Sequence, residues 1–319
     1  MRPFDLSGLR TYDLDSRPSK VGVADLGRPV SADVSVADWL DSLPNQLAAI
    51  ELRKVRDHVI RAFKNKHLVA VALGGHVIKT GCAPYLIDLI ERGVIGSVSM
   101  NGAAAIHDFE LGYAGKTSED VGAVLHAGNF GMARETAAAY AVAAKRGAET
   151  GRGLGYGLGE CLDLAPCRNP EVSLVLACYR AGIPCTVHVA LGTDIVHMHP
   201  NVSGADLGEA SLLDFRLLCT VISKLAHGVW MNLGSAVVMP EVFLKAVSVV
   251  RNFGHDLAGL VAVNFDKESK YRTVMNVLRR PASEGIEVIG HHELLIPMFH
   301  VAVSAQLAAL GSETRLKVA

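Results

Sequence analysis

The sequence predicts an α/β fold in which one doubly wound parallel sheet has helices packed on both faces. Short, continuously apolar segments of strand length alternate along the chain with longer segments of helical periodicity. Turns rich in glycine and other small residues follow several of the apolar segments, at the position where ligands of open α/β sheets bind. Half of the 319 residues are hydrophobic and one fifth are charged, which excludes a mostly disordered chain.

The chain begins with an irregular, polar stretch. Asp, Ser, Pro and Gly are spread through residues 1–35, which we expect to form an arm, and residues 36–319 are expected to form a single domain. From Val36 to Phe63 apolar residues recur at helical spacing. Pro44 marks either a break in this segment or the first turn of its longer part.

The first predicted unit of the sheet is a strand, a helix and a second strand. His67–Leu73 and Val94–Met100 are apolar runs of strand length and Pro84–Arg92 is amphipathic, so a right-handed crossover should join two parallel strands. The pattern continues with strands over residues 184–191, 229–233 and 257–264 and with helices over residues 172–181, 212–225, 240–253 and 294–310. Residues 151–159 carry glycine at every second position, and we expect them to be the most mobile part of the interior.

The turns after the strands are candidates for a nucleotide phosphate site. Glycines let a ligand approach the backbone, amides at a helix start can hold a phosphate and a lysine adds charge, although no Walker spacing is present. The candidates are Gly74, Gly75, Lys79 and Thr80 after the first strand, Ser99, Asn101 and Gly102 at the second, and Gly234 and Ser235 at a later one. Tight structural turns with a solvated lysine are the alternative interpretation.

Ionisable side chains also follow the strands. His107 and Asp108 would act as a proton-transfer pair if the fold brings a further partner to them, and the alternative is a helix start with Asp108 at the surface. The segment after residue 191 contributes Asp194, His197 and His199. Its His-x-His spacing, together with the His291-His292 pair, leaves a composite metal site open, with packing or hydrogen-bonding histidines as the alternative.

Charge and hydropathy narrow the functional classes. The formal net charge of −1 provides no basic field to hold a nucleic acid. No apolar run reaches the ~18 residues that a membrane helix needs, and the first residues lack the apolar core of a signal peptide. We therefore expect a cytoplasmic protein with reduced cysteines and with neither nucleic acid nor membrane as a partner. The surplus of apolar residues favours self-association.

The order of these motifs resembles that of the deoxyhypusine synthase family. The similarity runs, with gaps, from about Leu68 to Phe299. It is carried by residues 169–173 leading to 181–184 (NPEVS … AGIP), 190–194 (ALGTD), 233–238 (LGSAVV), 261–264 (VAVN) and 294–298 (LLIPM). The ALGTD segment resembles an Ala-Leu-Thr-Asp segment of the family with one inserted glycine, and LGSAVV resembles its nucleotide turn.

The resemblance implies a Rossmann-like domain, a homotetramer built from tight dimers, and NAD bound near the dimer interface. In that family NAD oxidises spermidine, and the aminobutyl group passes through an imine on an enzyme lysine to a lysine of a translation factor. For this chain it implies NAD across the turns named above, with Glu171 and Asp266 as weaker polar candidates. It also places substrate contacts on the segment that holds Asp194 and His199.

The sequence departs from the family pattern where the chemistry takes place. Leu207, beside Asp206, stands where the family has its lysine. Gly182 replaces a histidine, Met198-His199 replaces a Gly-Asp pair, and Ile106-His107 replaces paired glutamates. These differences predict that the covalent step is lost and that deoxyhypusine synthesis itself is not the reaction.

Three functions follow from these observations. The first is a deoxyhypusine synthase-like, NAD-dependent transferase or dehydrogenase that acts on a small amine or polyamine without a lysine adduct. The second is a metal-assisted, non-redox enzyme that uses the histidines. The third is a ligand-binding or scaffolding protein that has kept the fold without the chemistry. Lys79, Lys267 and Lys270 are substitute nucleophiles if another loop or subunit brings them in.

Overall fold

A six-stranded, fully parallel sheet forms the centre of the computed structural model, which describes residues 1–164 and 167–311. The strands are β1 (Val69–Leu73), β2 (Ser97–Asn101), β3 (Cys185–His188), β4 (Val229–Leu233), β5 (Val261–Asp266) and β6 (Glu284–Ile289). Their spatial order is β3-β2-β1-β4-β5-β6. Strands β2 and β3 therefore lie on one side of the central pair β1 and β4, and β5 and β6 lie on the other side. This is the Rossmann order, and the predicted fold class is confirmed.

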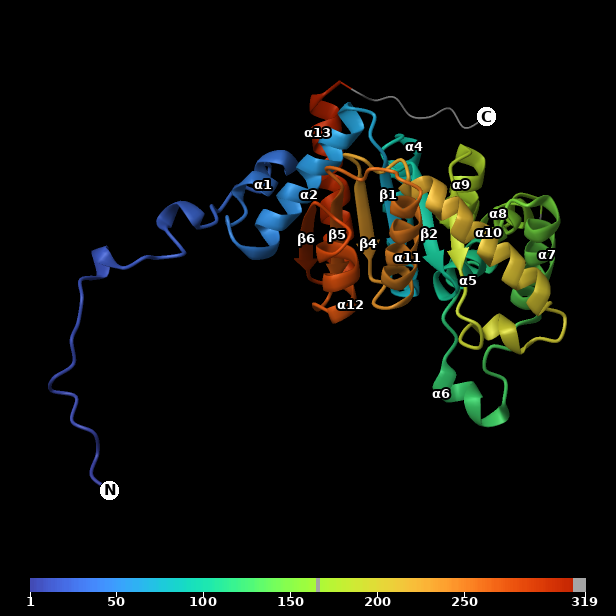
Figure 1. Cartoon of the computed structure of the whole chain (residues 1–319), viewed down its shortest axis with the longest axis horizontal. Helices are drawn as coiled ribbons and strands as arrows, with labels where there is room; N and C mark the ends of the chain where they lie inside the picture. The colour runs from blue at the N-terminus through green and yellow to red at the C-terminus, as the bar shows by residue number, and fades with distance from the viewer. Residues whose placement is uncertain (165–166, 312–319) are drawn as a thin grey trace.

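Helices cover both faces of this sheet (Figure 1). Alternate residues of a strand point to opposite faces, so Val69, Val71 and Leu73 pack into the larger core and Ala70 and Ala72 into the smaller one. The larger core is closed by α2 (Leu47–Lys64), α3 (Gly75–Lys79), α4 (Ala83–Glu91), α5 (Gly102–Ala114), α9 (Leu174–Ala181) and α13 (His292–Ala309). The smaller core is closed by α11 (Val238–Asn252) and the second half of α10 (Gly204–Ile222).

Two further helices, α7 (Arg134–Thr150) and α8 (Leu154–Leu164), pack against each other beside β3. The shorter elements are α1 (Val36–Ser42), α6 (Val121–Val124), α12 (Tyr271–Thr273), the single turns η1 (Leu14–Ser16), η2 (Val23–Asp25), η3 (Leu125–Ala127), η4 (Pro170–Val172) and η5 (Ile195–Met198), and the π-helical segment Val274–Arg279. In the described part of the chain, no helix combines the length and the apolar character needed to cross a membrane.

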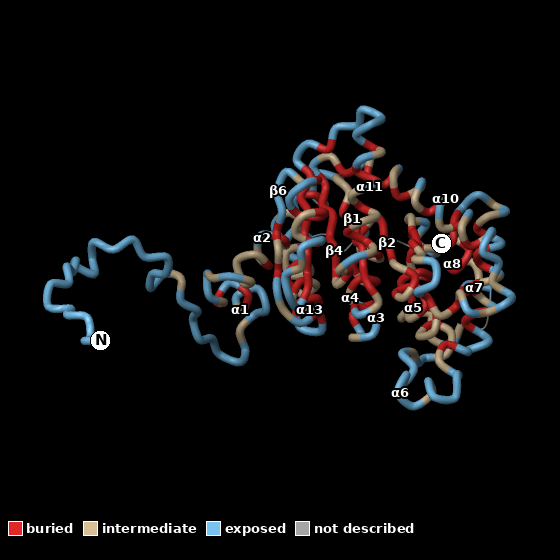
Figure 2. The backbone as a smooth tube through the Cα atoms, turned by 60° about the horizontal axis from the view of Figure 1, so that its bottom comes forward, coloured by how far each residue is buried: buried red, intermediate tan, exposed pale blue. Residues whose placement is uncertain are grey.

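The first residues lead away from the sheet. Residues 1–33 are almost all exposed, and they extend to the side of the molecule on which α1 and α2 lie (Figure 2). Near α1 the chain is anchored by backbone hydrogen bonds from Arg28 N to Ser42 O (2.9 Å) and from Asn45 N to Asp25 O (2.9 Å). The division into an arm and one domain stays a proposal, and residues 312–319 of the proposed domain lie outside the described residues.

The prediction that residues 151–159 are mobile is wrong. Helix α8 begins at Leu154, and its glycines are points of close approach to neighbouring elements. A Cβ on Gly155 would lie 2.0 Å from the Cys185 carbonyl oxygen, and one on Gly157 would lie 2.1 Å from the Ala143 carbonyl oxygen. The alternating glycines therefore serve backbone-to-backbone packing of α8 on β3 and α7.

Asp214 of α10 joins β3 to the start of α8. Its Oδ2 accepts hydrogen bonds from the backbone amides of Val187 (2.8 Å) and Gly155 (2.9 Å). The side chain is fully buried, and burial raises the pKa of Asp214 to about 8 against the opposing effect of these hydrogen bonds. The carboxyl group is thus a buried connector held by main-chain donors.

Gly157→Ala should destabilise the protein by about 1–3 kcal/mol, because the new methyl group overlaps the Ala143 carbonyl and forces α7 and α8 apart. Gly208→Ala in α10 is the matched control, since no atom lies within 4 Å of the position that its methyl group would take, and it should stabilise the helix by up to ~1 kcal/mol. Denaturant unfolding measures both free energies. Equal stability of the two variants would contradict the close packing of α8.

Asp214 should make stability fall with rising pH. Its folded pKa of about 8 lies above the unfolded value of ~3.9, so between these values the native state binds more protons than the unfolded state. The free energy of unfolding of the wild type, minus that of Asp214→Asn, should therefore decrease from pH 5 to pH 8, by up to ~1.4 kcal/mol per pH unit. Denaturant unfolding at several pH values measures this difference, and an increase with pH would contradict the buried, protonated carboxyl group.

Candidate functional site

The turns after β1 and β4 meet where the strand order reverses. Gly74 N donates to the Leu233 carbonyl oxygen (3.0 Å), and a Cβ on Gly74 would lie 2.5 Å from the Gly234 carbonyl oxygen. Gly234 has a φ of +61°, and a Cβ there would lie 2.7 Å from Cε1 of His292. Both positions therefore require glycine, and they hold the two backbones in contact at the place where Rossmann-like sheets bind their ligands.

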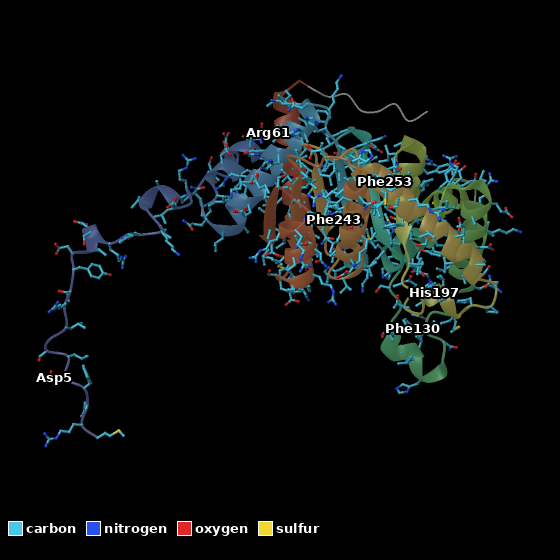
Figure 3. All side chains as sticks on the ribbon, viewed as in Figure 1. Asp5, Arg61, Phe130, His197, Phe243 and Phe253 are labelled. Atoms are coloured by element: carbon cyan, nitrogen blue, oxygen red, sulfur yellow. The ribbon has the colours of Figure 1, made fainter. Side chains whose placement is uncertain are left out.

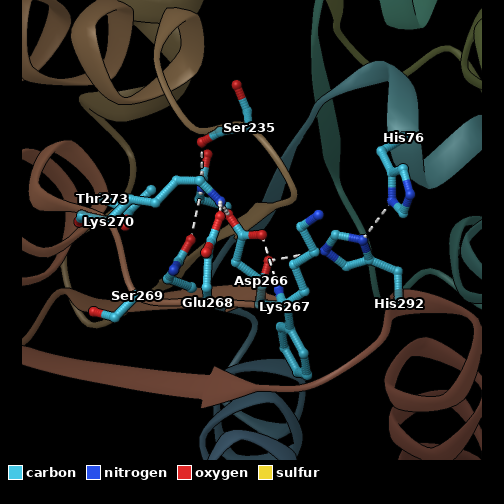
Figure 4. Close-up of polar contacts among 12 residues, drawn as sticks. His76, Ser235, Asp266, Lys267, Glu268, Ser269, Lys270, Thr273 and His292 are labelled. Atoms are coloured by element: carbon cyan, nitrogen blue, oxygen red, sulfur yellow. Dashed lines mark hydrogen bonds and ion pairs between the residues drawn. The ribbon is translucent and has the colours of Figure 1, made fainter.

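Polar groups at the ends of β4 and β5 surround the Gly234 turn (Figure 4). The Ser235 carbonyl oxygen accepts from Asn232 Nδ2 (2.9 Å), and Asn232 Nδ2 also donates to Asn264 Oδ1 (2.8 Å). Asp266, buried at the end of β5, accepts from Lys270 Nζ (3.3 Å). These contacts fix the shape of the turn, and Ser235 and Asp266 lie beside it.

A pair of histidines also lies at this turn, and the sequence did not identify it as a unit. His76, the second residue of α3, places its Nδ1 3.0 Å from Nδ1 of His292, the first residue of α13 (Figure 4). His292 is buried, and its Nε2 lies 3.2 Å from the Phe265 carbonyl oxygen, which only accepts. Burial lowers the pKa of His292, so the neutral ring carries its hydrogen on Nε2 and accepts from His76 Nδ1–H.

A cavity of about 840 Å³ opens on the other side of the β1 turn. Gly75 packs against one of its wall residues, since a Cβ there would lie 3.1 Å from Cδ2 of His107 on α5. The wall includes Lys79, His107, Glu110, Thr117, Arg168 and Asp194. In the part of the chain that the structure describes, neither Lys79 nor Arg168 forms an ion pair. Figure 3 labels Phe130, which also lines the cavity, and His197 at this end of the molecule.

His107 and Asp108 do not form a pair. His107 faces the cavity, where burial, and then the charge of Lys79, lower its pKa to about 4. Asp108 points into the core and caps α9: it accepts from Ser173 Oγ (2.6 Å) and from the amides of Leu174 (2.7 Å) and Val175 (3.1 Å). Burial raises the pKa of Asp108 to about 6. Its carboxyl group therefore has a structural use, and the interpretation of Asp108 as a surface residue is wrong as well.

The segment after β3 brings Asp194 to the start of α5. Asp194 lies against Gly102, whose Cα would carry a Cβ only 2.0 Å from Asp194 Oδ2. This oxygen is buried and has no hydrogen-bond partner among the described residues, and burial raises the pKa of Asp194.

His197 accepts from Gly192 N through Nδ1 (3.1 Å), and its Nε2 lies 3.8 Å from Asp194 Oδ2. His199 Nε2 donates to the Gly131 carbonyl oxygen (2.8 Å), which ties this segment to the cavity wall.

Three of the proposed cofactor residues have structural contacts in this fold, and a fourth lies away from the turns. Thr80 Oγ1 donates to the His76 carbonyl oxygen (2.9 Å) at the end of α3, and Asn101 Oδ1 caps α5 by accepting from Ala104 N (2.9 Å). Ser99 is buried inside β2 and accepts from Thr186 Oγ1 (2.8 Å). Glu171 lies in η4, which packs at the C-terminal end of α5, away from the turns. Ser99 and Glu171 are therefore not brought to the candidate site.

The histidines do not converge on a metal. Within residues 1–164 and 167–311, no group of three or more His, Cys, Asp or Glu side chains has the arrangement needed to hold a metal ion. His199 is bonded to a carbonyl, His292 to His76, and His291 lies near Glu293 (3.7 Å). The composite site that the sequence left open is not assembled from these residues.

Comparisons with known proteins show the fold. No family model matches the chain, and no curated protein matches it. Among solved structures, the AgrE complex with ornithine and NAD+ aligns with a TM-score of 0.55 at 16% identity, over 82% of this chain and 34% of AgrE. A LOR/SDH protein from Methanococcus maripaludis S2 aligns with a TM-score of 0.51 at 16% identity, over 82% of this chain and 70% of that one.

A protein of Entamoeba histolytica assigned as a deoxyhypusine synthase aligns with a TM-score of 0.51 at 11% identity, over 88% of this chain and 96% of that one. The chain thus spans about a third of AgrE (34%) and nearly all of the Entamoeba protein (96%). At these identities the likeness establishes the architecture only. The chain shares its fold with the deoxyhypusine synthase-like and LOR/SDH proteins.

Proposed function

We propose that the protein is an NAD-dependent enzyme that acts on a small amine, bound in the cavity beside the β1 turn. The observation that carries this proposal is Asp194 Oδ2, a buried carboxylate oxygen without a hydrogen-bond partner among the described residues, on a side chain that lines the cavity and lies against the start of α5. A buried carboxylate oxygen without a hydrogen bond costs free energy, and a substrate ammonium group would supply both that hydrogen bond and a positive charge. A polyamine or another amine of similar size fits the volume of about 840 Å³.

The residues at the turns after β1 and β4, where the strand order reverses, fit a dinucleotide. Gly74 and Gly234 bring the backbones of the two turns into contact where the strand order reverses, and Ser235 and Asp266 place polar atoms beside them. Gly74, Gly75, Gly234 and Ser235 would hold the cofactor, and Lys79 at the end of α3 would add positive charge for its phosphates. NAD, when bound, would supply an acceptor for a hydride, that is, for two electrons and one proton.

The residues of the cavity would bind and orient the amine. Asp194 would hold the ammonium group, and His199 would keep the Asp194 segment against Gly131. Ornithine and NAD+ are bound together in AgrE, and this supports an amine substrate on the shared fold. We also propose that a second copy of the chain is the partner, as a dimer or tetramer, and that the protein is cytoplasmic.

Binding measurements test the cofactor and the amine separately. NAD at millimolar concentration should raise the melting temperature, and ornithine or spermidine should bind the NAD complex in calorimetry. Asp194→Asn should keep the NAD effect and weaken amine binding roughly tenfold to a hundredfold, since a charged hydrogen bond contributes about 1.5–3 kcal/mol. Asp41→Asn on α1, an exposed carboxylate, is the control.

Two results would contradict the proposal. No thermal shift with NAD, with or without the amines, would reject the cofactor. Unchanged amine affinity in Asp194→Asn would place the amine elsewhere.

The absence of a lysine at residue 207 predicts a reaction without a covalent imine. Leu207 is 1% exposed within α10, and Asp206 lies beside it in the first turn of that helix. Lys270 is engaged by Asp266 and Glu268. Incubation with NAD, spermidine and borohydride should therefore leave the mass of the protein unchanged, because a stable adduct requires an amine at the reacting carbon. An adduct mapped by mass spectrometry to Lys79, Lys267 or Lys270 would overturn this prediction.

A further inference from the structure

A chain of hydrogen bonds runs along the cavity wall behind His107. His107 Nδ1 lies 2.7 Å from Thr117 Oγ1, Thr117 Oγ1 donates to Glu110 Oε2 (2.5 Å), and Thr136 Oγ1 donates to Glu110 Oε1 (3.1 Å). His107 and Glu110 are neighbours one turn apart on α5, Thr117 follows that helix, and Thr136 belongs to α7. Three segments thus meet at one carboxylate.

This series of hydrogen bonds determines which atoms carry the hydrogens of His107, Thr117 and Thr136. An ionised carboxylate only accepts, and each threonine hydroxyl has one hydrogen to donate, so both hydroxyl hydrogens point at Glu110. Thr117 Oγ1 then presents a lone pair to His107, and the hydrogen between them belongs to His107 Nδ1. The neutral ring therefore has its free lone pair on Nε2, for which the described residues offer no partner.

The surroundings favour the neutral ring. Burial and the charge of Lys79 on α3 lower the pKa of His107 to about 4. The other charged side chains at the same cavity are the acidic Glu110, Glu119, Glu135 and Asp194 and the basic Lys116 and Arg168. At pH 7 the imidazole is uncharged, so it does not repel a cation. A neutral ring with a lone pair on Nε2 is an acceptor for an N–H group.

We propose that His107 Nε2 accepts a hydrogen bond from the ammonium group of the substrate, and that Thr117 and Glu110 are the positioning residues that keep it an acceptor. This deepens the proposed function and rests on it, because the amine is the ligand in both. Asp194 supplies the countercharge and His107 an uncharged second acceptor, an arrangement that selects amines over ligands of the same length that carry only acceptors.

The experiment compares Thr117→Val, Thr117→Ser and the control Thr220→Val, an exposed threonine of α10. Two-bond ¹⁵N correlation spectra at pH 7 report the tautomer of His107 in the full chain. Wild type, Thr117→Ser and Thr220→Val should show hydrogen on Nδ1, and Thr117→Val should lose this preference. Calorimetry with the NAD complex should show putrescine binding about tenfold weaker in Thr117→Val, restored in Thr117→Ser, with NAD affinity equal in all four proteins.

The spectra and the calorimetry distinguish a failure of this inference from a failure of the proposed function. Hydrogen on Nε2 in the wild type, or no change of tautomer in Thr117→Val, overturns the role of Thr117 and Glu110 whatever binds. A tautomer that behaves as expected in a protein that binds no amine overturns the role of His107 as an amine acceptor and the proposed function with it. Weaker putrescine binding in Thr117→Val that Thr117→Ser does not restore assigns the loss to packing and contradicts the positioning role.

Discussion

The contact between the Gly74 and Gly234 turns is the constraint on which the candidate site depends. Because no side chain separates them, the backbones after β1 and β4 are in contact. This contact lies where the strand order of the sheet reverses. Gly75 then lets His107 pack against the start of α3, and Gly234 lets His292 pack beneath its turn. The cavity and the proposed cofactor site are thus two sides of one backbone contact.

Buried carboxyl groups in this protein differ in how they are satisfied. Asp108 and Asp214 each accept two or more hydrogen bonds, mainly from backbone amides, and they join elements far apart in the sequence. Asp194 is buried as well, but its Oδ2 receives no hydrogen bond from any described residue. Asp214 Oδ1 is also without a hydrogen bond from the described residues, but Asp194 lines the cavity of about 840 Å³ and Asp214 does not, and this difference is the reason to look for a ligand at Asp194.

The sequence predicted the secondary structure well where the burial of apolar residues alone determines it. The apolar run at residues 229–233 coincides with β4, and most of the predicted helices occur within a few residues of their expected ends. Strand β6 was not predicted, because this edge strand carries Glu284 and Glu287 among its apolar residues. The glycines of α8 were taken as a sign of mobility, since one sequence does not distinguish a flexible glycine from one that touches a neighbouring backbone.

The site was less predictable than the sheet, and for a geometric reason. Consecutive helical residues point in different directions, so Asp108 could not share the environment of His107, whereas Glu110 at the i+3 position could. That spacing was the available signal for the hydrogen-bond chain. Thr117 lies in an irregular segment, and His76 and His292 are 216 positions apart, so no local sequence pattern reveals their contact.

The glycines of α8 also bear on the order in which the protein folds. Each glycine in a helix interior costs about 1 kcal/mol relative to alanine, so a segment with Gly155, Gly157 and Gly159 has little tendency to become helical by itself. Its helical form depends on contact with α7 and β3, which must already be in place. We therefore expect α8 to form after the transition state for folding, so that changes at its contacts alter the rate of unfolding more than the rate of folding.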